Sequence, residues 1–217
     1  MSLAHLDTVL EMPFLSLPVR TTVVPVSGGR VLISPGSKLT AEQYASAGTV
    51  TDIVAPNLLH TAGMAAAARA FPKARLWGPK GAKKKHPELA WHGVLGEDAW
   101  PYEAELTAIP IRGLERSREF VFLDRATRSL IATDLVFNMI DASGLGARII
   151  FGMFGSYRRF AISRLLLRMA NDKQALRASI ADLCARDFDT IVPGHGAILE
   201  QGGKAALLAA ARERGLA

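Results

Sequence analysis

Near the end of the chain stands Thr190-Ile191-Val192-Pro193-Gly194-His195-Gly196, the segment on which our interpretation of the whole sequence rests. Its β-branched residues are typical of a buried strand, which the proline then ends. The glycines beside the histidine let a ligand or another part of the backbone approach closely. An imidazole in such a place can bind a metal or act as an acid or base, although this segment alone fits an ordinary hydrogen-bonded loop histidine better.

Length and composition are those of a globular protein. The chain has 217 residues, of which 49% are hydrophobic and 21% charged, enough for one sizeable core. It contains no repeat, low-complexity segment or obvious linker, so we expect a single domain over residues 1–217. One cysteine, Cys184, excludes an intrachain disulfide and any site built from several cysteines.

The net charge of +6 would suit an anionic partner. However, few aromatic residues lie among the basic ones, so we do not expect nucleic-acid binding. The N-terminus has no basic region followed by an apolar run, and the most apolar segment, Ile149 to Gly155, is too short to span a bilayer. We therefore expect a soluble, cytoplasmic protein without a membrane span.

Strands and helices alternate along the chain, which favours an α/β fold. The patterns predict strands at residues 19–26, 30–33, 52–55, 75–77, 106–111, 119–124, 129–133 and 190–192. They predict helices at residues 41–47, 64–71, 159–169, 173–185 and 204–214. The glycine-rich, apolar segment 138–155 is expected to be irregular. It would pack over the edge of the sheet or, alternatively, form a lid or the interface of a homodimer.

Three polar residues each follow a predicted buried strand: His60, Asp134 and His195. Open α/β sheets place their ligands at the carboxyl ends of strands, so these side chains are candidates for one site. Two imidazoles and a carboxylate suit a divalent metal with room left for water. The alternative is three unrelated polar residues, because aspartate is common in the turn after a strand.

The order of these elements resembles the metallo-β-lactamase fold superfamily over nearly the whole chain. The resemblance rests on Asn57-Leu58-Leu59-His60-Thr61-Ala62-Gly63, then Thr133-Asp134, then Pro193-Gly194-His195-Gly196. The segment Val54-Ala55-Pro56-Asn57 is similar to that of an uncharacterised bacterial branch, carried as a domain of unknown function. The resemblance implies a four-layer αβ/βα sandwich with the site at one edge of the two sheets.

The chain departs from the metal signature of that superfamily, His-x-His-x-Asp-His. In this window only the last histidine is present, as His60. Ala55 and Asn57 stand where the first two histidines are usual, and Leu59 stands where the aspartate is usual. Alanine and leucine cannot ligate a metal, and an asparagine amide is a poor ligand for zinc. The resemblance thus implies that the first metal position of the superfamily is empty here.

A further histidine is usual before the strand at 119–124, where this chain has Gly113-Leu114-Glu115. Glu115 and Asn57 are therefore the candidate additional ligands beside the three residues at strand ends. By the resemblance, Asp134 matches the aspartate that bridges two metals and His195 the last histidine ligand. The second metal position keeps these two residues together with His60, which implies a single metal.

These residues predict a metal-dependent hydrolase with at most one divalent ion. The ion would be zinc, or else iron or manganese; the alternative is a site without metal. In this interpretation His60, Asp134 and His195 hold the ion, and Asp134 also orients the attacking water. The substrate would be an unidentified small molecule with an ester, thioester, lactone or phosphoester bond; hydrolysis of antibiotics is not expected. The alternative is a catalytically inactive protein of the same fold that binds a small molecule or itself.

Overall fold

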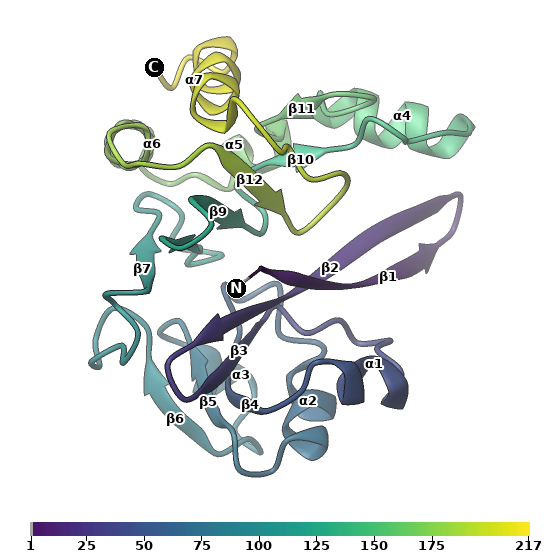
Figure 1. Cartoon of the computed structure of the whole chain (residues 1–217). Coiled ribbons are helices and arrows are strands. Elements are labelled where there is room, and N and C mark those ends of the chain that lie inside the picture. Colours follow the sequence, from purple (N-terminus) through teal and green to yellow (C-terminus); the bar gives the residue numbers. More distant parts are fainter. Residues whose placement is uncertain (1) are drawn as a thin grey trace.

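The computed structural model describes residues 2–217, and its backbone forms two facing β-sheets with helices on their outer sides (Figure 1). The first sheet has the strand order β1-β2-β3-β4-β5-β6. Its strands are β1 (Ala4–Met12), β2 (Leu15–Val26), β3 (Gly29–Ile33), β4 (Val50–Val54), β5 (Arg75–Gly78) and β6 (Trp91–Val94). The strands β1, β2 and β3 are antiparallel, whereas β3, β4, β5 and β6 run parallel to one another.

The second sheet has the order β12-β9-β8-β7, with β12 parallel to β9 and the other pairs antiparallel. Its strands are β7 (Leu106–Pro110), β8 (Phe120–Asp124), β9 (Ser129–Ala132) and β12 (Thr190–Pro193). A separate short pair is formed by β10 (Phe137–Asn138) and β11 (Phe160–Ala161). Because β9 and β12 are parallel, the residues that follow them leave the sheet at the same edge.

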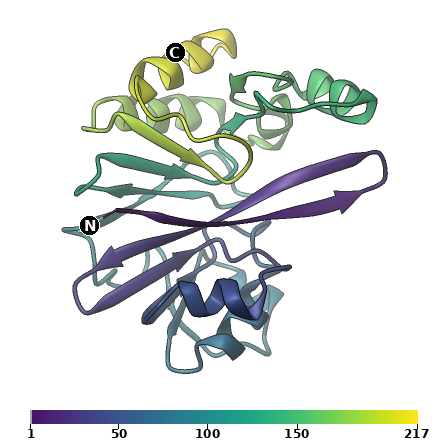
Figure 2. The ribbon, with the colours of Figure 1, turned by 45° about the vertical axis from the view of Figure 1, so that its right-hand side comes forward.

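Helices cover the outer face of each sheet (Figures 1 and 2). They are α1 (Ala41–Ser46), α2 (Met64–Ala70), α3 (Ala82–Lys85), α4 (Leu145–Phe154), α5 (Arg164–Met169), α6 (Lys173–Cys184) and α7 (Gly203–Glu213). Side chains of α1 and α2 share a buried cluster with the first sheet, and those of α6 and α7 share one with the second. Among residues 2–217 no helix is long and apolar enough to cross a membrane.

Alternation along the strands fills the space between the sheets. In β3, Leu32 packs toward the helices, whereas its neighbours Val31 and Ile33 join the cluster between the two sheets. From the second sheet, Phe122 and Val192 enter the same central cluster. The resulting order is helices, sheet, sheet, helices, so the expected four-layer αβ/βα sandwich is confirmed.

Most of the expected elements are present within one or two residues of their expected bounds. The expected helix from Ala41, for example, begins at a capping box, in which Thr40 and Gln43 exchange side-chain to backbone hydrogen bonds. Two strands of the first sheet, β1 and β6, were not predicted. Strand β1 escapes prediction because it is an edge strand with no regular apolar alternation, and most of its side chains are exposed or half-buried.

Two expectations near the middle of the chain are wrong. The segment 138–155 is not irregular throughout, because residues 145–154 form α4. Its internal glycines do not break the helix, and Gly155, with a positive φ, ends it. The helix expected over 159–169 begins only at Arg164, where Ser163 caps its N-terminus, and residues 160–161 belong to β11 instead.

A buried carboxylate ties β4 to β5 and to the loop between β6 and β7. Asp52 of β4 is fully buried and accepts hydrogen bonds from Arg75 Nε at 2.9 Å, Trp77 Nε1 at 2.7 Å and the Tyr102 hydroxyl at 2.6 Å. Burial alone would raise the pKa of Asp52, but the hydrogen bonds from Arg75, Tyr102, Trp77 and Thr51 outweigh it and lower the pKa.

We expect Asp52→Asn to lower the free energy of unfolding by about 2 kcal/mol at pH 7, because an amide cannot accept all the hydrogen bonds that the buried carboxylate accepts. A lowered pKa in the folded state gives stability that is present above the ordinary pKa of about 3.9 and is lost as the pH falls further. The difference from the unmodified protein should therefore shrink in urea unfolding at pH 3. Asp182→Asn, which removes an exposed ion pair with Arg112, is the control and should cost less than about 1 kcal/mol. An equal loss from both variants would contradict the account.

Candidate metal centre

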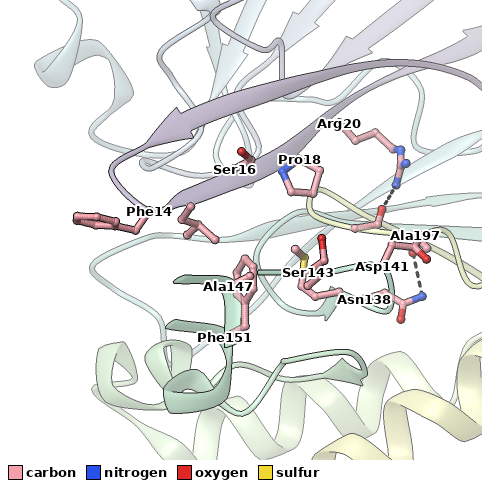
Figure 3. A pocket seen from close by; sticks show the side chains of 14 residues that line it. Phe14, Ser16, Pro18, Arg20, Asn138, Asp141, Ser143, Ala147, Phe151 and Ala197 are labelled. Carbon is pink, nitrogen blue, oxygen red and sulfur yellow. Dashed lines mark hydrogen bonds between the residues drawn. The ribbon is translucent and has the colours of Figure 1, made fainter. Parts of the chain in front are cut away.

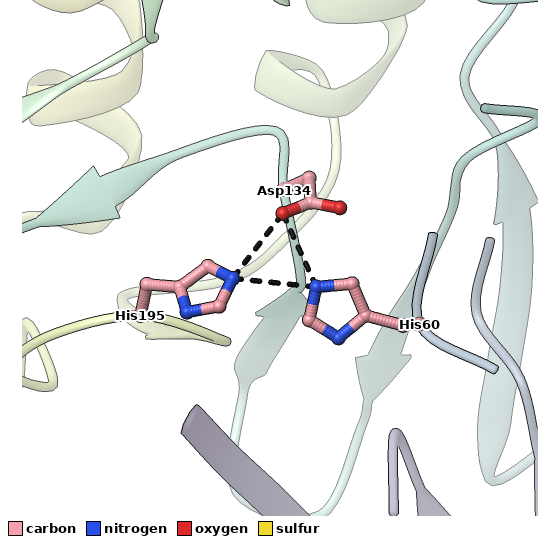
Figure 4. Close-up of side chains that lie close together, drawn as sticks. All are labelled: His60, Asp134 and His195. Atoms are coloured by element: carbon pink, nitrogen blue, oxygen red, sulfur yellow. Dashed lines mark hydrogen bonds and ion pairs between the residues drawn. The ribbon is translucent and has the colours of Figure 1, made fainter. Parts of the chain in front are cut away.

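Three side chains from different parts of the chain meet at one edge of the two sheets (Figure 4). His60 Nε2 lies 3.2 Å from Asp134 Oδ1, His195 Nε2 lies 3.4 Å from the same oxygen, and the two Nε2 atoms are 3.3 Å apart. His60 lies in the loop after β4, Asp134 just after β9 and His195 just after β12. The structure thus brings together the three residues that the sequence placed at strand ends.

The ring of His195 is held in a single orientation. Its Nδ1 donates a hydrogen bond to the carbonyl oxygen of Pro18 in β2 at 2.7 Å. Because a carbonyl can only accept, the proton of the neutral ring is on Nδ1 and Nε2 carries the lone pair. Phe137 stacks on the ring, with centroids 5.0 Å apart and planes inclined by 17°. The unprotonated Nε2 of His195 therefore points toward His60 and Asp134, where its lone pair could bind a metal.

His60 is held from both its side chain and its backbone. Ser34 Oγ lies 2.8 Å from His60 Nδ1, and Ser34 itself has the uncommon φ of +57°. The turn containing Ser34 packs directly on the His60 loop, because a Cβ at Gly63 would lie 1.9 Å from the Pro35 carbonyl oxygen. The side-chain oxygen of Asn57 accepts the backbone N–H of His60 at 2.8 Å. Together these contacts fix where the His60 ring points.

Asn57 and Glu119 form a buried support beneath Asp134. Asn57 Nδ2 donates to Glu119 Oε2 at 2.6 Å and to Asp134 Oδ2 at 2.7 Å, and its oxygen accepts the N–H groups of Leu59 and His60. Both amide hydrogens and both oxygen lone pairs of Asn57 are thus engaged. Glu119 Oε1 accepts the backbone N–H groups of Asp134 at 2.8 Å and Leu135 at 3.1 Å. Asn57 therefore lies beside Asp134 as a bridge between carboxylates.

The structure does not bring Glu115 to the three residues. Its side chain is 63% exposed and forms an ion pair with Arg118 at 3.6 Å. Glu119, four positions later, is the glutamate that reaches the site, and sequence reasoning missed this role. The available signal was a charged residue directly before Phe120–Asp124, a strand whose residues are all buried.

The pKa values of the buried acids diverge. Burial raises the pKa of Glu119 from 4.5 to about 8, with the negative charge of Asp134 adding to the effect and the hydrogen bonds from the Asp134 backbone and Asn57 opposing it. For Asp134, burial opposes ionisation, but the positive charge of His60 and its hydrogen bond hold the pKa of Asp134 well below the usual range. Burial likewise opposes the charged form of His60, whose pKa is nevertheless raised by Asp134. Asp134 is the ionised carboxylate of the cluster.

Two cavities lie on opposite sides of β2. A cavity of about 220 Å³ is lined by His60, His195 and Lys38 together with apolar residues that include Leu17 and Val19. A larger one of about 540 Å³ lies between β2 and the start of α4 (Figure 3). Side chains alternate along β2, so Ser16, Pro18 and Arg20 face the larger cavity and the intervening residues face the smaller. The histidines therefore open on a small, mostly apolar cavity.

The spacing of the three donor atoms is close to that of the ligand atoms in a divalent metal site. In a tetrahedral zinc site with bonds of about 2.0–2.2 Å, ligand atoms lie about 3.3–3.5 Å apart. The observed separations are 3.2, 3.3 and 3.4 Å. Two imidazole nitrogens and one carboxylate oxygen are suitable donors for zinc, iron or manganese. Within residues 2–217 no other group of three potential ligands comes this close, so the fit applies to one metal.

No protein-family model and no curated protein matches this sequence. Solved structures do match it in fold. A metallo-β-lactamase from Pontibacter korlensis superposes with a TM-score of 0.65 at 16% identity, over 97% of this chain and 94% of that one. A metallo-β-lactamase from Erythrobacter litoralis gives 0.63 at 20% identity, over 95% and 91% of the two chains.

A third similar structure is the metallo-β-lactamase FIM-1 from Pseudomonas aeruginosa in a mono-zinc form. Its TM-score is 0.62 at 12% identity, over 96% of this chain and 90% of that one. The chain thus has the metallo-β-lactamase fold, as its sequence elements suggested. At 12–20% identity the similarity establishes the fold only, so any statement about chemistry has to rest on the residues of the site.

Proposed function

We propose that this protein is a metal-dependent hydrolase that holds one divalent ion on His60, Asp134 and His195. The observation that carries the proposal is the spacing of their three donor atoms, 3.2–3.4 Å, with His60 and His195 lining a cavity. A metal bound there would supply Lewis acidity and lower the pKa of water to near neutrality. The mono-zinc form of the similar metallo-β-lactamase from Pseudomonas aeruginosa supports a one-metal interpretation of this fold.

The residues around the site prepare it for that role. The hydrogen bond from His195 to Pro18 and the contact of His60 with Ser34 orient both rings, which reduces the cost of ordering them on binding. Asp134 has one oxygen beside the histidines and the other held by Asn57. Ionised and only 14% exposed, Asp134 is also the residue that would orient an attacking water.

The cavity beside the histidines favours a substrate with an apolar substituent. Its walls are mainly apolar, and its only lysine is Lys38. Leu59, at the position where the superfamily has an aspartate, is 54% exposed and contributes to this wall. Esters, thioesters and lactones with hydrocarbon substituents fit such a surface, and phosphoesters would draw on Lys38 for their charge.

Hydrolysis of a panel of these substrates tests the proposal. With zinc, iron(II) or manganese(II) added, we expect turnover of at least one ester, thioester, lactone or phosphodiester. Asp134→Asn, which removes the charged metal ligand that orients the water, should lower the rate by about 100-fold or more. The exposed substitution Asp182→Asn should leave the rate unchanged. Full activity in Asp134→Asn would contradict the proposed site, and metal binding without any turnover would favour the non-catalytic alternative.

A further inference from the structure

Large apolar side chains gather on the tip of the β1–β2 hairpin and on α4. Phe14 at the tip is 90% exposed, and Leu145, Ile149 and Met153 of α4 are 74%, 58% and 53% exposed. Figures 1 and 2 both show the hairpin tip and α4 projecting on the same side of the molecule. Soluble proteins rarely expose large contiguous apolar patches, and such a patch commonly marks an interaction surface.

The exposed side chains of α4 form one stripe. Leu145, Ile149 and Met153 are spaced by four residues, so they lie on the same face of the helix. The opposite face is also apolar, because Ala147 and Phe151 pack in a buried cluster with residues of β2. The fold buries only the face with Ala147 and Phe151, so the apolar face with Leu145, Ile149 and Met153 is free to contact a partner.

The hairpin tip is fixed against α4, which makes the surface continuous. A Cβ at Gly146 would lie 1.6 Å from the carbonyl oxygen of Phe14, so only glycine permits this approach. Phe14 itself has a φ of +68°, a backbone conformation that is unusual for an aromatic residue. The fold thus holds an aromatic side chain outward in a strained conformation, beside the stripe on α4.

Most of the charges around this surface are positive, and the acidic residues beside it are Glu11 near the hairpin tip and Asp141 before α4. Residues 142–171 contain five arginines and no aspartate or glutamate. Arg148 lies on α4 itself, and Arg158 and Arg164 are exposed near its C-terminal end. Arg159 is the exception among the exposed arginines, because it is paired with Glu213. Within residues 2–217 the other exposed arginines of this segment form no ion pair, and an apolar stripe bordered by them is complementary to a surface that is apolar inside and anionic outside.

We propose that the hairpin tip and α4 form a docking face for a bilayer that contains anionic phospholipid. Phe14 and the α4 stripe enter the interface, and the arginines meet lipid phosphates. A second copy of the chain fits this surface less well. Pairing of α4 across a two-fold axis would bring Arg148 of each copy into an apolar interface without an acidic partner on the helix. Docking would also place the larger cavity, which Phe14 and Phe151 line, close to the bilayer.

Co-sedimentation with phosphatidylcholine vesicles, with and without phosphatidylglycerol, tests this proposal. We expect binding to the anionic vesicles that weakens as salt is added. Ile149→Glu should weaken this partitioning by about tenfold or more, and Arg148→Gln by about fivefold. Ala178→Glu, on the exposed face of α6, is the matched control and should bind as the unmodified protein does. Circular dichroism would verify that each variant is folded.

Three results would overturn the proposal. The first is no binding to anionic vesicles at low salt. The second is equal binding to vesicles without anionic lipid, which would remove the role of the arginines. The third is a dimer in light scattering that Ile149→Glu dissociates, without vesicle binding, which would assign the surface to a second copy of the chain. None of these outcomes depends on metal binding or on hydrolysis, so the test is independent of the proposed function.

Discussion

Replacing His195 or His60 by alanine is expected to weaken zinc binding by about two to three orders of magnitude. Zinc sites in proteins are worth about 10–16 kcal/mol in total, so one of three protein ligands contributes several kcal/mol. Titration calorimetry of the metal-free protein measures this loss directly. His92→Ala is the matched control, because His92 is an exposed histidine on β6, outside the three-residue cluster.

The two histidine variants also separate binding from folding. Besides the contacts with His60 and Asp134, His195→Ala removes the hydrogen bond to Pro18 and the stacking on Phe137, and circular dichroism should still show native structure. Zinc affinity that is unchanged in both variants would place the metal elsewhere. Zinc affinity lost equally in His92→Ala would show that the assay reports general histidine binding.

The second large effect is expected at Glu119. Glu119→Ala should lower the free energy of unfolding by about 3–5 kcal/mol, since it leaves the N–H groups of Asp134 and Leu135 and the amide of Asn57 without an acceptor. Glu119→Gln keeps an acceptor for the two backbone groups, and its loss should be intermediate. Urea unfolding of the metal-free proteins measures both values.

The contribution of Glu119 to the free energy of unfolding is expected to depend on pH. Glu119 binds its proton more tightly in the folded state, with a pKa of about 8 against 4.5. A raised pKa means that its contribution to stability is fully present below pH 4.5 and is lost as the pH rises toward 8. Glu119→Gln cannot ionise, so the loss of stability between these values should be smaller in this variant. An unaltered pH profile would contradict the assignment of the proton to Glu119.

Local patterns predicted most of the fold. The strands β5, β8 and β12 and the helices α2 and α6, for example, follow from residues close together in sequence, and all are present. The segment around α4 shows the limit of such patterns. Glycine there suggested an irregular backbone, but Gly146 is needed inside the helix because the hairpin tip lies against it. That requirement comes from a contact between residues far apart in sequence.

The site was predictable only in part for the same reason. His60, Asp134 and His195 each follow a strand, and the parallel arrangement of β9 and β12 brings two of them to one edge. Asn57 and Glu119 lie 62 positions apart, and Asn57 and Asp134 lie 77 apart. No local sequence pattern could therefore predict the hydrogen bonds between them. Tertiary packing, rather than a motif, selects Glu119 over Glu115.

The most direct test of the central claim is the metal content of the protein after incubation with zinc, iron(II) or manganese(II) and removal of the unbound ion. Elemental analysis should find one ion per chain, retained in His92→Ala and absent from His195→Ala. Two ions per chain would contradict the one-metal site, and no bound ion under any of these conditions would contradict the metal-dependent hydrolase itself.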